Sequence, residues 1–184
     1  MATGGSLALG VPTITPSGYV SVSAGTVILS GYVSSYEAGS GSTITLTYDA
    51  NSFCAKGTVA ANATYNSWAG VGFNVNQSQT GASGSTGSLV FSGSSITVNY
   101  INRAGSILEY QLWDGTNYWC YRLPPATIAT AVKIPFTSLN TRCWDNLGTT
   151  FPSGTPVTTV QLVVPGSASS PTPFDYCFLG MTVQ

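Results

Sequence analysis

Charged side chains are scarce in this sequence, and histidine is absent altogether. Lysine, arginine, aspartate and glutamate make up 6% of the 184 residues, and the net charge at pH 7 is -1. In an ordinary globular domain about a quarter of the residues are charged. Because binding to nucleic acid or to an anionic membrane depends on clustered positive charge, this composition argues against both partners. We expect the ligand of this protein to be uncharged.

The absence of histidine also limits the available chemistry. Without it the chain cannot build a Ser-His-Asp or Cys-His catalytic group, or a histidine-ligated metal centre. The glycine-rich stretches 39–42 and 81–87 lack the lysine and the helix of a phosphate-binding loop. Residues 1–5 lack the basic start and apolar core of an export signal, and no apolar run approaches the ~20 residues of a membrane helix. We interpret residues 1–5 as a linker or an added start, with the native signal or a preceding domain missing.

Four cysteines are present and no two of them form a C-x-x-C pair: Cys54, Cys120, Cys143 and Cys177. Structural zinc is therefore not expected. An even number of cysteines without metal-binding spacing is typical of disulfides formed in an oxidising compartment. The sequence predicts two disulfides in a secreted, extracellular protein. The alternative is four buried free thiols in a cytosolic protein.

Helix-forming residues are scarce, while Val, Thr, Ile, Ser and Tyr are common and Gly or Pro recurs throughout. Short alternating runs separated by turn residues predict many short strands, hence a β-sandwich or barrel. No repeat or linker divides the chain, so we expect residues 1–184 to form one all-β domain. A hairpin turn is predicted at 114–117 and a mobile surface loop at 78–87. The predicted strands are 19–24, 26–35, 43–48, 57–60, 69–77, 88–92, 95–101, 107–113, 118–123, 131–135, 157–164 and 174–183.

Three stretches, 68–77, 95–101 and 107–113, alternate between apolar residues and a second set that is rich in amides and also holds two tryptophans and a glutamate. The apolar positions predict the core face of each strand, and the others a second face. A pyranose stacks its C–H face on indole or phenol rings and pairs its hydroxyls with amides and carboxylates. The second face therefore predicts a site for neutral polysaccharide, formed by Trp68, Asn74, Asn76, Asn99, Glu109, Gln111 and Trp113.

The remaining two tryptophans each follow or precede a cysteine. Trp119 is a further candidate for the binding site, although its parity with Tyr121 and Leu123 also fits a core position. Trp144 follows Cys143 in a predicted loop, where we expect it to pack on the disulfide.

Several segments resemble the β-jelly-roll carbohydrate-binding modules of secreted bacterial plant-cell-wall hydrolases. The resembling stretches are 53–59, 67–77, 119–120, 143–145 and 173–177. The resemblance implies a two-sheet antiparallel jelly roll whose concave sheet holds a β-glucan chain, such as mixed-linkage glucan, xyloglucan or cellulose oligomers. It implies a module that keeps an attached glycoside hydrolase near its substrate.

The resemblance also implies that a structural calcium ion can accompany this fold. Calcium needs several carboxylate and carbonyl oxygens. No dense loop motif is formed by the six carboxylates, which are Glu37, Asp49, Glu109, Asp114, Asp145 and Asp175. We expect a monomer that requires no cofactor, with calcium as an option.

Four cysteines permit three pairings, and the sequence does not decide among them. We favour Cys120 with Cys143, because these two cysteines lie at the two ends of a single short segment of the chain. We favour Cys54 with Cys177, because that pair would tie an early strand to the last one.

Two other functions stay open. A jelly-roll glycoside hydrolase needs two facing carboxylates, about 5–5.5 Å or about 6.5–9.5 Å apart. Glu109 lies in a stretch similar to the nucleophile strand of small xylanases, but no glutamate follows it to act as their acid/base, which leaves Asp145 or Asp175. We therefore expect no enzyme activity. The third candidate is a structural or adhesive surface domain without a sugar site.

Overall fold

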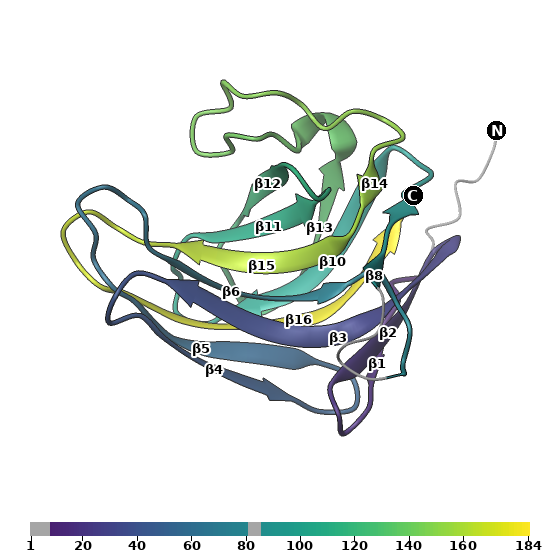
Figure 1. The fold of residues 1–184 in the computed structure, drawn as a ribbon, viewed down its shortest axis with the longest axis horizontal. Coiled ribbons are helices and arrows are strands. Elements are labelled where there is room, and N and C mark those ends of the chain that lie inside the picture. The colour runs from purple at the N-terminus through teal and green to yellow at the C-terminus, as the bar shows by residue number, and fades with distance from the viewer. Residues whose placement is uncertain (1–7, 81–85) are drawn as a thin grey trace.

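Alternating apolar residues fold this chain into two β-sheets packed face to face (Figure 1). The computed structural model describes residues 8–80 and 86–184. The first sheet has the order β1-β2-β3-β6-β15-β11-β12, with β7 and β8 beside β3, and the second has the order β13-β10-β16-β5-β4. All neighbours on these two paths are antiparallel, as the resemblance to two-sheet jelly rolls implied.

The first sheet consists of β1 (Pro12–Ile14), β2 (Tyr19–Ala24), β3 (Val27–Ala38), β6 (Trp68–Asn74), β7 (Asn76–Gln77), β8 (Thr86–Gly87), β11 (Leu108–Trp113), β12 (Tyr118–Leu123) and β15 (Thr159–Pro165). The second consists of β4 (Thr43–Tyr48), β5 (Phe53–Val59), β10 (Ser95–Asn102), β13 (Ala126–Pro135) and β16 (Thr172–Val183). A small separate pair is formed by β9 (Leu89–Val90) and β14 (Pro156–Val157).

The predicted strands 19–24, 43–48 and 118–123 coincide with β2, β4 and β12. Strand β13 (Ala126–Pro135) begins five residues earlier than predicted, because its first five residues are mostly Ala and Thr and do not alternate regularly between apolar and polar residues. Residues 81–85 of the predicted loop lie outside the described residues, and so does the predicted linker at 1–5. Within residues 8–80 and 86–184 the one helix is the three-residue η1 (Phe136–Ser138), and none there is long and apolar enough to cross a membrane.

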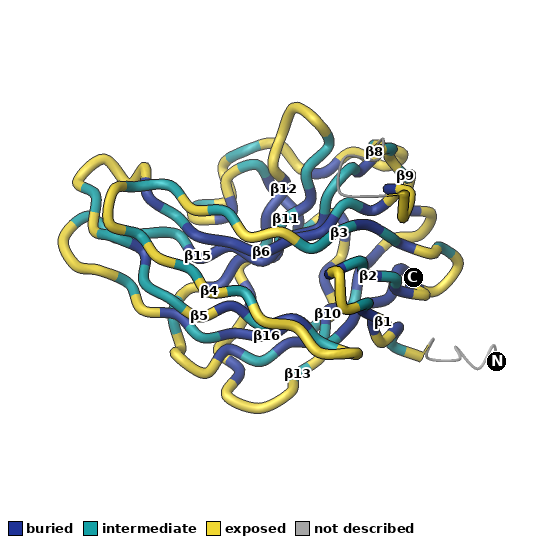
Figure 2. Tube along the Cα trace, turned by 60° about the horizontal axis from the view of Figure 1, so that its bottom comes forward, coloured by how far each residue is buried: buried dark blue, intermediate teal, exposed yellow. Residues whose placement is uncertain are grey.

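Aromatic rings from both sheets meet in the core. Phe73 of β6 lies edge-on to Phe53 of β5 and Phe178 of β16, with ring centroids 6.1 and 6.0 Å apart, while Phe53 and Phe178 stack at 4.8 Å. Tyr176 of β16 donates its hydroxyl to the backbone oxygen of Leu162 on β15, 3.0 Å away. Buried residues follow the central strands, and exposed ones gather in the loops (Figure 2). Each fully buried large apolar side chain contributes about 1.5–3 kcal/mol to holding the sheets together.

Both favoured disulfides are confirmed. Cys54 and Cys177 lie directly opposite each other on β5 and β16. Cys120 of β12 bonds to Cys143 in the loop between η1 and β14. Cys120 is the cross-strand partner of Gln111 on the face turned away from the core, so this bond holds the loop over the outer face of the first sheet.

The two disulfides should contribute unequally to stability. They close loops with sequence separations of 123 and 23 residues. Because the loop-closure entropy of the unfolded chain grows with loop length, replacing Cys54 and Cys177 by Ala should lower the free energy of unfolding by about 5 kcal/mol. The same change at Cys120 and Cys143 should lower it by about 3.5 kcal/mol. Guanidinium unfolding of the two double variants measures this difference, and an inverted order would contradict it.

Candidate functional site

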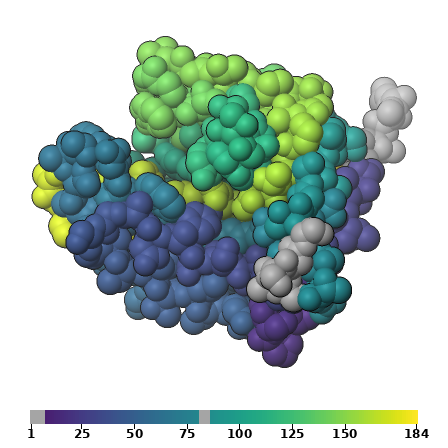
Figure 3. Space-filling view, in the orientation of Figure 1, coloured from purple at the N-terminus to yellow at the C-terminus, as the bar shows by residue number. Residues whose placement is uncertain are grey.

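The outer face of the first sheet holds an open cavity of about 240 Å³. Five strands, β3, β6, β11, β12 and β15, supply its lining. A hollow lies on this side of the molecule, beside the green lobe formed by the loop after η1 (Figure 3). The lining residues are Ser34, Tyr36, Trp68, Asn74, Trp113, Tyr118, Thr159 and Gln161.

Two aromatic pairs flank this cavity. Trp113 and Tyr118 are cross-strand partners on β11 and β12, and their rings stack with centroids 4.2 Å apart. Tyr36 of β3 and Trp68 of β6 meet edge to face at 5.4 Å. Asn74 shares a cross-strand row with Trp113 and lies six residues beyond Trp68 on β6, about 20 Å along the strand. The two pairs therefore mark opposite ends of the cavity.

Two glycines of β6 let neighbouring side chains lie flat across the floor of the cavity. A Cβ atom at Gly70 would come within 3.1 Å of Cε2 of Tyr36, and one at Gly72 within 2.7 Å of Cβ of Gln161. A side chain at either position would push these groups away from the sheet. The glycines thus set the depth of the site.

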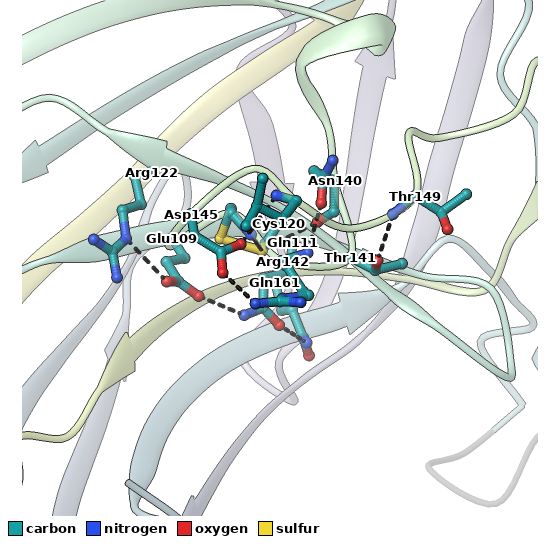
Figure 4. The surroundings of a disulfide bond; sticks show 12 residues. Glu109, Gln111, Cys120, Arg122, Asn140, Thr141, Arg142, Asp145, Thr149 and Gln161 are labelled. Atoms are coloured by element: carbon teal, nitrogen blue, oxygen red, sulfur yellow. Dashed lines mark hydrogen bonds and ion pairs between the residues drawn. A yellow bond between two sulfur atoms is a disulfide. The ribbon is translucent and has the colours of Figure 1, made fainter.

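A chain of hydrogen bonds crosses the sheet between the aromatic pairs. The Tyr36 hydroxyl donates to Oε1 of Gln161, and Nε2 of Gln161 donates to Oε1 of Gln111 at 2.8 Å. Nε2 of Gln111 in turn donates to Oε2 of Glu109 at 3.0 Å. Nε of Arg122 lies 3.5 Å from the other carboxylate oxygen. Figure 4 shows this chain from Arg122 to Gln161. We call Tyr36, Gln161, Gln111 and Glu109 the amide relay.

Burial changes the acidity of both ends of the amide relay. It raises the pKa of Glu109 above the usual 4.5, against the opposing effect of the Gln111 hydrogen bond and the Arg122 charge. Burial also raises the pKa of Tyr36 well above its usual 10.0. The phenol therefore keeps its proton, which agrees with its role as the first donor of the relay.

Asp114 braces the hairpin that carries the stacked aromatic pair. Its Oδ1 accepts hydrogen bonds from the backbone N–H groups of Thr116 and Asn117, and its Oδ2 accepts one from the indole of Trp119 at 2.8 Å. Although burial opposes the change, these bonds lower the pKa of Asp114. The hairpin predicted at 114–117 is confirmed.

The loop after η1 borders the site on the β12 side. Backbone hydrogen bonds join Asn140 and Cys120 in both directions, beside the disulfide. Arg142 pairs with Asp145, and its guanidinium lies 5.8 Å from the ring centroid of Trp144. Trp144, which we expected to pack on the disulfide, is 56% exposed, so most of its surface faces solvent.

One group of three potential metal ligands lies within the described residues: Glu109, Cys120 and Cys143. Both sulfurs belong to the disulfide and are not thiolates. Calcium binds six to eight oxygen ligands, and this group offers one carboxylate that is already paired with Arg122. The group does not fit calcium, and calcium has no part in the function proposed below.

The cavity gathers some of the predicted site residues and not others. Trp68, Asn74 and Trp113 line it. Gln111 and Glu109 lie beside the cavity in the amide relay. We expected Glu109 to contact the ligand directly, but the residue is only 5% exposed and is buried behind the cavity.

Three predicted residues are corrected by the structure. Asn99 belongs to β10 in the second sheet, because alternation assigns a face but does not say which sheet a strand joins. Asn76 lies on β7, beyond the end of β6, and its amide donates to the backbone oxygen of Ser88. Trp119 is 4% exposed and packs edge-on against Phe151 in the core.

Sequence reasoning missed five of the lining residues. Thr159 and Gln161 alternate with Val160, Leu162 and Val164 in the predicted strand 157–164, so the same parity argument would have placed them on the outer face. Tyr118 and Ser34 could have been placed in the same way on strands 118–123 and 26–35. Tyr36 lies one residue past the predicted end of its strand.

Comparison with known proteins finds no matching family model and no matching curated protein. Among solved structures, the family 11 carbohydrate-binding module of a cellulosomal cellulase of Clostridium thermocellum aligns at 14% identity with 80% of this chain and 87% of its own, with a TM-score of 0.51. The fold is that of a carbohydrate-binding module. A family 11 module from Clostridium thermocellum in complex with a β-1,3-1,4-mixed-linked tetrasaccharide covers 83% of this chain and 91% of its own, at 14% identity and a TM-score of 0.50.

Removing the Asp114 carboxylate should destabilise the hairpin at neutral pH. Asp114→Ala leaves the Trp119 indole without its acceptor, so the free energy of unfolding should fall by about 1–3 kcal/mol. Because the pKa of Asp114 is lower in the folded state, its contribution exists above the usual 3.8 and is lost as the pH falls further. Asp49→Ala is the matched control, since Asp49 caps a similar turn but binds no indole. Urea unfolding at neutral and acidic pH should show a larger loss for Asp114→Ala, and equal losses would contradict the role of the indole bond.

Proposed function

We propose that this domain binds a chain of neutral polysaccharide in the cavity on the outer face of the first sheet and has no catalytic role. The observation that carries the proposal is the arrangement of two aromatic pairs around a floor of amides and hydroxyls. Aromatic rings stack on the C–H faces of sugar rings, and the floor supplies partners for the hydroxyls.

The polar groups of the floor suit an uncharged ligand. All eight lining residues are uncharged at neutral pH, so a sugar is held without ionic contacts. Gln161 and Asn74 have amide hydrogens beyond those used in their internal bonds, while the hydroxyls of Ser34 and Thr159 donate or accept. Affinity then comes from stacking and from many modest hydrogen bonds.

A β-glucan is the polysaccharide that we propose as the ligand. The fold is shared with a module whose structure holds a mixed-linkage tetrasaccharide, which supports mixed-linkage glucan as the first candidate. Xyloglucan and cello-oligosaccharides are the others. A recessed floor between two aromatic pairs suits a single soluble chain better than the flat surface of crystalline cellulose.

We also propose the setting in which the domain works. Two disulfides fit a secreted, extracellular protein. A domain that holds a glucan without cleaving it would act as a monomer that keeps an attached glycoside hydrolase near its substrate.

The positions of the two glutamates support binding without hydrolysis. Glu109 is buried beside the cavity and engaged by Gln111 and Arg122. Glu37 follows Tyr36 on β3, so it points to the opposite face of the sheet. A glycosidase needs two carboxylates facing one bond, and these two do not share a face.

Trp113 should provide a large part of the affinity. Trp113→Ala removes the stacking surface at one end of the cavity, and the dissociation constant for soluble mixed-linkage glucan should rise about 30-fold. Trp144→Ala is the control, because it removes an exposed indole that does not line the cavity, and its affinity should be unchanged. Isothermal titration over a panel of soluble glucans measures both, with thermal unfolding as a check on the fold.

A reducing-sugar assay on the same mixtures separates binding from hydrolysis. Heat of binding without release of sugar is the expected result. Release of reducing ends by the wild-type protein would show that the domain is an enzyme, and unchanged binding of Trp113→Ala to every glucan would show that the site lies elsewhere.

A further inference from the structure

Glu109 stands out because it is buried beside the cavity without lining it. The residue is 5% exposed, and its carboxylate receives Gln111 on one oxygen and Arg122 on the other. Burial of a carboxylate is costly unless the group is paired and hydrogen-bonded. An aliphatic residue would fill the position without the desolvation cost of a carboxylate. The geometry therefore indicates that Glu109 has a role beyond packing.

The hydrogen bonds of the amide relay all run in one direction. Tyr36 donates to Gln161, Gln161 donates to Gln111, and Gln111 donates to Glu109. An ionised carboxylate only accepts hydrogen bonds, and a guanidinium only donates them. The amide nitrogen of Gln111 must therefore face Glu109, and each earlier amide and hydroxyl is turned accordingly.

We propose that Glu109 is a positioning residue for the ligand: its ionised carboxylate sets the direction of the amide relay and thereby what Tyr36 and Gln161 present to a sugar. This inference rests on the proposed function. In this direction the Tyr36 proton is engaged by Gln161, so Tyr36 offers its oxygen to the cavity as an acceptor. Gln161 offers the amide hydrogen that Gln111 does not take.

Protonation of Glu109 reverses the relay. Arg122 occupies Oε1 as a donor, so the proton resides on Oε2 and faces Gln111. Gln111 then turns its oxygen toward Glu109 and its nitrogen toward Gln161, and Gln161 turns its nitrogen toward Tyr36. The Tyr36 hydroxyl is left to point its proton into the cavity. A sugar hydroxyl that met an acceptor now meets a donor at the same place.

The surroundings of Glu109 leave few other charges to control this change. Arg122 faces it from β12, and the apolar Val163 is its cross-strand partner on β15. In the loop held by the disulfide, Arg142 and Asp145 pair with each other. Burial raises the pKa of Glu109 above its usual 4.5, so this carboxylate takes up a proton at a higher pH than an exposed glutamate does. The relay direction in the structure is the one set by the ionised form, so a ligand matched to this arrangement should lose affinity as the pH falls through the raised pKa.

Glu109→Gln tests the proposal without changing the shape of the side chain. In this variant the oxygen of the new amide accepts a hydrogen bond from Arg122, so the amide nitrogen faces Gln111. The relay is therefore held in the reversed direction at every pH. Isothermal titration with mixed-linkage glucan oligosaccharides at neutral pH should give about tenfold weaker binding for this variant. Wild-type affinity should fall toward that of the variant as the pH is lowered to 4.5, while the affinity of the variant stays constant.

Tyr36→Phe provides a second variant that leaves Glu109 and both amides in place. It removes the hydroxyl that presents the change to the ligand, so its affinity should vary much less with pH than that of the wild type. Thermal unfolding identifies any variant that fails to fold. A flat wild-type pH profile, or an unchanged pH profile in folded Glu109→Gln, would overturn the role of Glu109.

The same titrations separate this inference from the proposed function. If the wild type binds no glucan at neutral pH, the proposed function fails, and the positioning role fails with it. If the wild type binds, Trp113→Ala loses affinity and Glu109→Gln matches the wild type at both pH values, only the role of Glu109 is overturned.

Discussion

The alternation of the first sheet is the constraint on which the rest of this structure depends. One face of β6, β11 and β15 supplies Phe73, Leu112 and Leu162 to the core, so anything that the sheet does for a ligand must come from the other face. In a chain with 6% charged residues, that face draws its polarity from amides and hydroxyls. A neutral, hydroxyl-rich ligand is the partner that such a surface recognises best.

Strand alternation and turn residues are local signals, so the sequence predicted an all-β sandwich or barrel, and the resemblance to jelly-roll modules narrowed this to two antiparallel sheets. The favoured disulfide pairing is the one in the structure, although the sequence alone left three pairings open. The same alternation placed Trp68, Asn74 and Trp113 on the correct face. It failed for Asn99, since membership of one sheet or the other depends on the pairing of β10 with β13 and β16, which parity does not encode. The contact of Tyr36 with Gln161 joins residues 125 positions apart and follows from the order of strands in the sheet.

At one border of the cavity, groups that stabilise the fold lie beside the proposed binding site. The Cys120–Cys143 bond holds the loop after η1 over β12, next to the carboxylate of Glu109. Asp114 braces the adjoining hairpin through the Trp119 indole, which lies in the core. Rigid support of this kind would reduce the conformational entropy that the protein itself loses on binding the proposed sugar chain.

The central claim is that the outer face of the first sheet binds neutral polysaccharide. The most direct test is to titrate ¹⁵N-labelled protein with a mixed-linkage glucan oligosaccharide and follow the four indole N–H signals and the side-chain amides. Our account predicts that the signals of Trp68, Trp113 and Gln161 shift strongly, while that of Trp144 stays unchanged. Shifts confined to the second sheet, or no shifts with any glucan, would contradict it.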